Sequence, residues 1–368
     1  MFDRFFSLFS YDLGIDLGTA NILVYIKGKG IAVREPSIVA RHNKSKQFIA
    51  VGTEAKKMLG KTPALIDAIK PLEHGVISDF DAAAYMLQYY IKKVHEIGKP
   101  LGQFARPKVV IGIPSGITEV ERRAVWEAAL NAGARECYLI EEPMAAAIGS
   151  NISVFEPTGA LIVDIGGGTT EIAVISLGGI VVNRSLRVAG NEMDQAIINY
   201  IRLRHGLLIG EKTAEEIKLK IGSAYRRVPN QKQKAREEEQ REKDGEPHGE
   251  KVAVIRGRSI ESGLPKSLKI SESEVREAIG PAIGAIIDTI LEVLEETPPE
   301  LTSDILERGI VLTGGGSLLH GIDDLIIDRT KIPVLLSADP LTTVVRGTAK
   351  LLEDVRLLNQ VKVTGGLK

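Results

Sequence analysis

The chain has 368 residues, 44% of them hydrophobic, which is enough apolar material for a large core in two domains or in one two-lobed unit. Its 47 basic and 48 acidic residues give a formal net charge of -1, so no overall field attracts nucleic acid, and we predict no nucleic-acid partner. The only cysteine, Cys137, excludes an intramolecular disulfide and suits a reducing compartment.

An aromatic stripe opens the chain. Phe2, Phe5, Phe6 and Phe9 recur at the spacing of one helical face. The segment is too short and too weakly basic for a signal peptide, and no apolar run reaches the roughly 18 residues that a membrane-spanning helix needs. Two explanations stay open: these side chains pack on the chain's own surface, or residues 1–10 lie in a membrane interface as an amphipathic anchor.

A strand, a glycine turn and a second strand follow between Gly14 and Ile26. Glycine lets the backbone approach a phosphate, and the turn amides with a threonine hydroxyl can donate hydrogen bonds to phosphate oxygens. Asp16, which stands just before the turn, suits the hydrated Mg²⁺ ion that such phosphates carry. The turn residues expected to bind phosphate are Gly18, Thr19, Ala20 and Asn21.

Helices and strands alternate through the rest of the first half. We expect a helix over 79–97, a buried strand over 108–114 and a helix over 118–132, which the capping box of Thr118 and Glu121 opens. The pattern is typical of an α/β domain.

Two acids, Glu141 and Glu142, precede Pro143 where a short strand gives way to a helix. A carboxylate at this position could hold an attacking water. An acid at a helix start is also favourable with the helix dipole alone, so from the residues both interpretations stay open.

The pattern of strand, aspartate, glycine turn and strand recurs over 160–176. Either copy alone is explained by the needs of a hairpin turn, which glycine and aspartate populate. Two copies favour a clamp that holds a nucleotide tail from both sides, with Asp164 as the second carboxylate for Mg²⁺. The turn residues expected to bind phosphate here are Gly166, Gly167, Gly168 and Thr169.

The remainder of the second half is expected to contain a helix near 192–204, a helix capped by Thr213 with Glu216, and a long helix opened by the capping box of Ser271 and Glu274. Residues 226–251 carry charges of both signs and too few apolar side chains for a core. We interpret them as a solvated insertion, with a disordered loop as the default and a partner-binding arm as the alternative.

A buried strand over 310–313 runs into a glycine turn, Gly314, Gly315, Gly316 and Ser317, where a purine or ribose could lie close to the backbone. Glu215, Glu216 and Lys218 could reach ribose hydroxyls, although a solvated helix face explains them as well. The neighbours Ile217 and Leu318 complete the expected nucleoside site. Two halves of this kind predict a duplicated α/β architecture with its ligand between the lobes.

These residues also carry a family resemblance. The two hairpins, Glu142 before Pro143 and the turn at 314–317 resemble the nucleotide-binding elements of the actin, Hsp70 and sugar-kinase superfamily. More narrowly, the strings at 16–21, 140–149, 164–171 and 312–318 resemble the MreB family of bacterial actin homologues, over residues 11 to about 358.

The resemblance implies an actin-like (ribonuclease H-like) two-lobe fold that binds ATP and Mg²⁺ and hydrolyses ATP slowly as it polymerises. It implies paired protofilaments on the inner face of the cytoplasmic membrane that organise cell-wall synthesis and maintain rod shape, with RodZ, MreC and MreD as partners. Lobe I would span 11–155, lobe II 156–345 with the insertion 226–251, and 346–368 would return to lobe I.

The family pattern also gives roles to single residues. It implies that Glu142 orients the attacking water and that the Thr169 hydroxyl contacts it. It favours the anchor explanation of the first ten residues, and it suggests a second apolar membrane contact at Leu101 and Phe104, beside the basic Arg106. The insertion 226–251 is longer than the family usually carries.

Two other functions in the same superfamily are the alternatives. An Hsp70-like chaperone ATPase would need a peptide-binding domain after the nucleotide unit, whereas this chain ends soon after Leu358. A small-molecule kinase would need an acidic base beside a sugar pocket, and the sequence offers no separate candidate for it.

Overall fold

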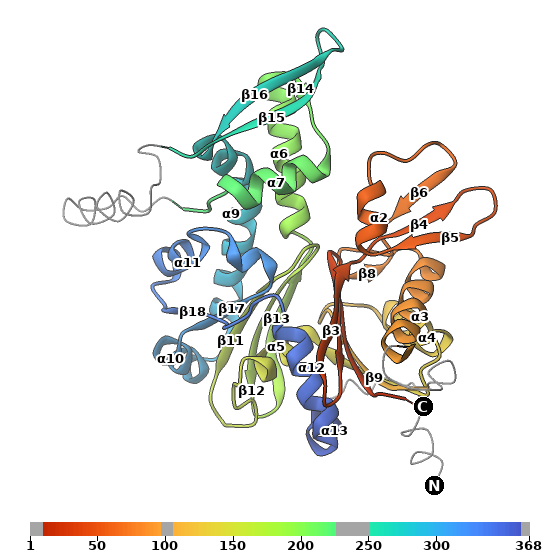
Figure 1. Cartoon of the computed structure of the whole chain (residues 1–368). Coiled ribbons are helices and arrows are strands. Elements are labelled where there is room, and N and C mark those ends of the chain that lie inside the picture. Colours follow the sequence, from red (N-terminus) through yellow and green to blue (C-terminus); the bar gives the residue numbers. More distant parts are fainter. Residues whose placement is uncertain (1–9, 97–105, 226–249, 362–368) are drawn as a thin grey trace.

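The computed structural model describes residues 10–96, 106–225 and 250–361, and within them the chain folds into two lobes around two five-stranded sheets (Figure 1). The first sheet has the order β10-β9-β1-β2-β3. Its strands are β1 (Leu13–Leu17), β2 (Asn21–Ile26), β3 (Gly30–Pro36), β9 (Lys108–Ile113) and β10 (Glu136–Glu141). The strands β1, β2 and β3 run antiparallel, whereas β9 and β10 continue the sheet in parallel from β1.

The second sheet repeats this plan in the order β13-β12-β11-β17-β18. Its strands are β11 (Ala160–Ile165), β12 (Thr170–Ser176), β13 (Gly179–Leu186), β17 (Ile310–Thr313) and β18 (Val334–Leu336). Again three strands form an antiparallel meander, and two parallel strands follow on the other side of the first. The repeated order confirms the predicted duplication, and we call the units built on the two sheets the first and the second lobe.

Helices cover both sheets and join the lobes. They are α3 (Phe80–Glu96), α4 (Glu119–Asn131), α5 (Glu142–Gly149), α6 (Gly190–His205), α7 (Glu211–Ile221), α9 (Glu272–Glu296), α10 (Pro299–Arg308), α11 (Ile322–Thr330), α12 (Thr343–Glu353) and α13 (Val355–Val361). The capping boxes at Thr118 and Ser271 are confirmed. Each side chain accepts a hydrogen bond from the backbone N–H of the glutamate three residues later, and the carboxylate of that glutamate accepts one from the backbone N–H of the cap residue. The cap expected at Thr213 is wrong, since α7 begins at Glu211 after Gly210.

Two small sheets rise above the lobes on either side of the space between them (Figure 1). On the first lobe β4 (Val39–His42), β5 (Phe48–Val51) and β6 (Ile66–Ile69) stand with α2 (Thr53–Met58), near the short hairpin of β7 (Leu72–Glu73) and β8 (Val76–Ile77). On the second lobe β14 (Leu207–Leu208), β15 (Val252–Ser259) and β16 (Pro265–Ser271) form the other.

Each lobe has its own buried core, and a third cluster of buried side chains from α5, α12 and neighbouring strands connects them. Close approach of α5 and α12 depends on Gly347, where a β-carbon would lie 1.9 Å from the carbonyl oxygen of Ala145. This tight helix pair fixes the base of the space between the lobes.

None of the described helices is long and apolar enough to cross a membrane. The predicted membrane contacts Phe2, Phe5, Phe6 and Phe9, and also Leu101 and Phe104, lie outside the described residues, as does most of the insertion 226–251.

Candidate nucleotide site between the lobes

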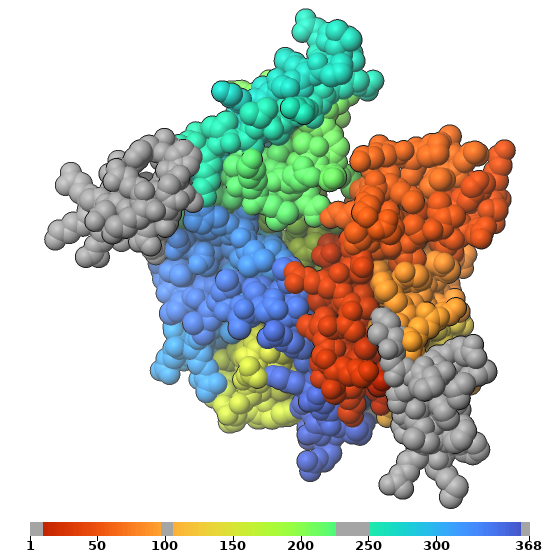
Figure 2. Space-filling model, in the orientation of Figure 1, coloured from red at the N-terminus to blue at the C-terminus, as the bar shows by residue number. Residues whose placement is uncertain are grey.

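A cavity of about 380 Å³ lies between the lobes, where Figure 2 shows the molecule hollowed between the red and orange first lobe and the green and blue second lobe. Both predicted hairpin turns line it, together with the glycine turn that follows β17. The predicted residues in its wall are Asp16, Gly18, Thr19, Ala20, Asn21, Glu142, Asp164, Gly166, Gly167, Gly168, Thr169, Glu215, Lys218, Gly314, Gly315, Gly316 and Leu318. Most of the predicted site is thus brought together by the fold.

The two hairpin turns face each other at van der Waals distance. A β-carbon on Gly167 would lie 2.5 Å from the β-carbon of Ala20, so only glycine permits this approach. Beside it, Thr19 accepts a hydrogen bond from the backbone N–H of Gly75 over 2.9 Å. The turns therefore present their backbones to the same small volume, as a phosphate clamp requires.

Three carboxyls, Asp16, Asp164 and Glu142, converge on this volume. Removal from water raises the pKa of Asp16 to about 7. Burial, and then the charges of Asp16 and Glu171, raise the pKa of Asp164 to about 8. Burial and the neighbouring carboxylates Glu171, Asp16 and Asp164 raise the pKa of Glu142 well above its usual range. Such a cluster favours binding of a cation, which would relieve the mutual repulsion.

The acids fit Mg²⁺ held largely by ligand and water oxygens. In the described part of the chain, Asp16, Asp164 and Glu142 form no ion pair with a basic side chain, and no group of three or more His, Cys, Asp or Glu residues could hold a metal ion by itself. Mg²⁺ in phosphate sites commonly takes one or two carboxylates and keeps several waters. The residues present are therefore compatible with an ion that arrives with a nucleotide.

The nucleoside end of the predicted site differs in detail from the expectation. Glu215 lines the cavity but binds Nζ of Lys56 in the first lobe over 2.8 Å, and Lys218 binds Asp194 over 2.9 Å and the Gly190 carbonyl over 2.7 Å. These two side chains thus have protein partners where we expected ribose.

Three predicted nucleoside contacts lie outside the cavity wall. Ile217 belongs to the core of the second lobe. Glu216 is exposed and lies 3.7 Å from Lys212. The buried hydroxyl of Ser317 donates to the carbonyl of Gly314 over 2.6 Å. Their side chains are engaged elsewhere, and a part for these residues in nucleoside binding stays a prediction.

Sequence reasoning missed several residues of the wall, among them Asn191, Asp194, Lys251, Glu272 and His320. Asn191 stands in the first turn of α6, and its N–H donates to the carbonyl of Gly167 over 2.7 Å. A helix start next to a glycine turn is a recognised signal for anion binding, so this element could have been found. Asp194 lies one turn further along the same helix, whereas Lys251, Glu272 and His320 come from distant segments and carry no local signal.

Comparison with known proteins agrees with the geometry. A family model described as MreB/Mbl protein matches residues 10–360. The chain belongs to the MreB/Mbl family. It is 49% identical over 361 residues to the cell shape-determining protein MreB of Escherichia coli (strain K12), covering 96% of each chain. It is 44% identical over 357 residues to the cell shape-determining protein Mbl of Bacillus subtilis (strain 168), covering 97% of this chain and 100% of the relative.

Solved structures of similar proteins share the fold. MreB5 of Spiroplasma citri bound to ADP superposes with a TM-score of 0.83 at 39% identity and covers 95% of this chain and 98% of its own. The same protein bound to AMPPNP gives the same score and identity over 94% of this chain and 97% of its own. The MamK double helical filament, at 24% identity and a TM-score of 0.74 over 94% of this chain and 99% of its own, shares the fold alone. The predicted actin-like fold is confirmed.

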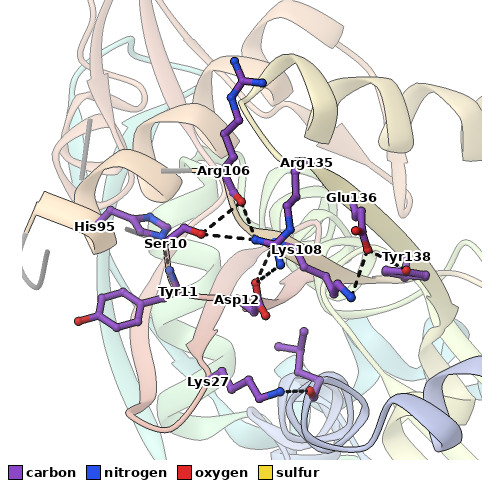
Figure 3. A network of polar contacts seen from close by, with 11 residues as sticks. Ser10, Tyr11, Asp12, Lys27, His95, Arg106, Lys108, Arg135, Glu136 and Tyr138 are labelled. Atoms are coloured by element: carbon purple, nitrogen blue, oxygen red, sulfur yellow. Dashed lines mark hydrogen bonds and ion pairs between the residues drawn. The ribbon is translucent and has the colours of Figure 1, made fainter. Parts of the chain in front are cut away.

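A polar network lies at the edge of the first lobe, away from the cavity (Figure 3). The N–H of Tyr11 donates to Nε2 of His95 over 2.8 Å, and the Ser10 hydroxyl donates to the carbonyl of Arg106 over 3.2 Å. Arg135 donates to the same carbonyl over 2.9 Å. Ser10 and Tyr11, which follow the aromatic stripe in sequence, therefore contact Arg106 and His95, which lie on either side in sequence of the segment that holds Leu101 and Phe104.

Proposed function

We propose that this chain is an ATP-dependent, filament-forming bacterial actin that assembles on the inner face of the cytoplasmic membrane and organises cell-wall synthesis to maintain rod shape. The observation that carries the proposal is the cavity in which two glycine turns and three carboxyls with raised pKa values converge. The family's cell shape-determining members and the ADP and AMPPNP complexes of MreB5 support it.

In the proposed reaction, slow ATP hydrolysis is coupled to polymerisation. The backbones of the turns at Gly18–Asn21 and Gly166–Thr169 would hold the phosphates. Glu142 would orient the attacking water and accept its proton, and the Thr169 hydroxyl would contact that water. Bound Mg²⁺, facing Asp16 and Asp164, would neutralise phosphate charge and favour the ionised forms of the nearby carboxyls.

The proposed membrane contact combines the stripe of Phe2, Phe5, Phe6 and Phe9 with Leu101 and Phe104. The network of Figure 3 supports the combination, because it joins described residues that adjoin both segments in sequence. A single subunit with few apolar anchors would bind weakly, and a polymer would multiply them. We accordingly place the protein in the cytoplasm, peripheral to the membrane, with RodZ, MreC and MreD as proposed partners.

The proposed division into lobes at 11–155 and 156–345, with 346–368 returning to lobe I, is supported at its last boundary. Helix α12 packs on α5 and on β1 of the first lobe, although it follows β18 of the second. Motion of one lobe would thus reach the other through this helix pair.

The test is co-pelleting of the purified chain with anionic liposomes, with and without ATP and Mg²⁺, followed by electron microscopy of the pellets. ATP-dependent filaments on the lipid would support the proposal. A monomer that hydrolyses ATP and phosphorylates a sugar or binds unfolded peptide would favour the kinase or the chaperone instead.

A further inference from the structure

One buried acid at the lobe interface has no role in the reaction described above. Glu171 lies in β12 and is 1% exposed. It stands opposite Asp164 of β11 and Ser185 of β13 in the sheet register. The matching position of the first hairpin, opposite Asp16, is Leu23. The hairpin fold therefore accepts a leucine here, and the acid needs another explanation.

The carboxylate of Glu171 is held from both lobes. One oxygen accepts a hydrogen bond from the Ser185 hydroxyl over 2.5 Å, within the second sheet. The other accepts from the Ser115 hydroxyl over 2.6 Å and from the Ser115 N–H over 3.1 Å. Ser115 follows β9 of the first sheet, so two of the three donors come from across the interface. Burial raises the pKa of Glu171 and these hydrogen bonds oppose that rise, and hydrogen bonds in so dry a place are strong and directional.

This bridge connects the two strand ends that carry the proposed reaction groups. On the second lobe, Glu171 is two residues after Thr169. On the first lobe, β9 pairs with β10 up to Glu141, directly before Glu142, and a β-carbon on Gly112 of β9 would lie 3.5 Å from Cγ of Glu142. A displacement of Ser115 relative to Glu171 would thus change the spacing between Glu142 and Thr169.

We propose that Glu171 is a positioning residue: its hydrogen bonds to Ser115 fix the relative position of the two lobes so that Glu142 and Thr169 contact the same water. The inference rests on the proposed function, since it concerns the same hydrolysis. Glu171 itself needs no contact with the nucleotide, and it is absent from the cavity wall. Small errors in the placement of reacting groups are costly, so the loss of the bridge should lower the rate more than the affinity.

The chain offers a matched pair of variants. Ser115→Ala and Ser185→Ala each remove one hydroxyl from the same carboxylate, but only the first weakens the link between lobes. For the full chain, we would measure affinity for a fluorescent ATP analogue with Mg²⁺, the rate of phosphate release, and the melting temperature. We expect Ser115→Ala to slow phosphate release roughly tenfold with affinity within about twofold of wild type. Ser185→Ala should change both by less than about twofold, with a similar loss of melting temperature.

Ser115→Thr keeps both donors and should restore the rate. If Ser115→Ala does not fold, Ser115→Cys against Ser185→Cys keeps the comparison, because a thiol is a weak donor of similar shape. Equal rates of phosphate release in the two variants would overturn this inference but not the proposed function, because the bond between lobes would then matter no more than the bond within the second sheet. A wild-type chain that binds the analogue but releases no phosphate would overturn the proposed ATPase, and the inference with it.

Discussion

The two hairpins have the same topology, but their turns have different surroundings. Thr19 and Thr169 are each 7% exposed. The hydroxyl of Thr19 is engaged by the N–H of Gly75, whereas the described residues provide no hydrogen-bond partner for that of Thr169. Opposite the aspartates stand Leu23 in one hairpin and Glu171 in the other. The two turns thus share a backbone plan and differ in their surroundings, and under the proposed function only the second offers a hydroxyl that has no partner among the described residues.

The largest effect is expected where the two hairpins converge on Glu142. Glu142→Ala removes the proposed proton acceptor but leaves both turns intact, so phosphate release should slow roughly 100-fold or more. Affinity for ATP, measured by titration with a fluorescent analogue, should change little. Glu141→Ala is the control, and a variant at Glu142 with wild-type turnover would move the role to Glu141 or elsewhere.

The next largest effect is expected on ATP affinity when either aspartate of the two hairpins is removed. Asp164→Ala and Asp16→Ala should each weaken ATP binding in the presence of Mg²⁺ by roughly 10- to 100-fold, since each removes a charged contact to the hydrated ion. Titrations without Mg²⁺ should show a much smaller loss. Asp164 is only 6% exposed and should be the more sensitive of the two. Unchanged affinity in both variants would refute the clamp.

A smaller effect is expected on the pH dependence of stability. Burial raises the pKa of Asp16 to about 7 and that of Asp164 to about 8, from an ordinary value of 3.8. The folded state then binds more protons than the unfolded state between about pH 4 and 8, so the free energy of unfolding falls as pH rises through that range. Thermal melts of the nucleotide-free protein from pH 6 to 8.5 should show this decline.

Asp164→Asn should flatten that decline more than Asp16→Asn, because the pKa of Asp164 is raised further. The same slope in wild type and in both variants would show that other groups cause the pH dependence.

The smallest effect is expected on the free energy of unfolding when a helix cap is removed in either lobe. Thr118→Ala and Ser271→Ala each remove the side-chain acceptor of a complete capping box, and each should cost about 1 kcal/mol of unfolding free energy in urea denaturation. Thr213→Ala, which caps no helix, is the control and should cost less. Equal losses at all three threonine and serine positions would contradict the cap assignments.

Local sequence predicted the framework of both the fold and the site. The strands, the capping boxes and the glycine turns follow from hydrophobic periodicity and from backbone geometry, which act within a few residues. For that reason Asp16, Asp164 and the two turns could be proposed from the residues themselves, whereas the choice of Glu142 needed the family resemblance; all of them line one cavity.

Periodicity was less informative on α7. The prediction placed Glu215, Glu216, Ile217 and Lys218 together in the nucleoside site, but successive helical residues point in different directions. Ile217 faces the core, Glu216 faces solvent, and only Glu215 and Lys218 reach the cavity wall. A helix contributes one face to a site, and the sequence of this short helix left that face undetermined.

The sequence by itself determined the elements and the chemistry each turn can offer, because those depend on neighbours along the chain. Only the tertiary structure decided which distant groups meet: Lys56 with Glu215, and Ser115 with Glu171. Such pairs come from separate lobes, so no spacing in the sequence sets the distance between their partners. Burial then raised the pKa of the carboxyls, since the pKa of an acid depends on the water and charge around it.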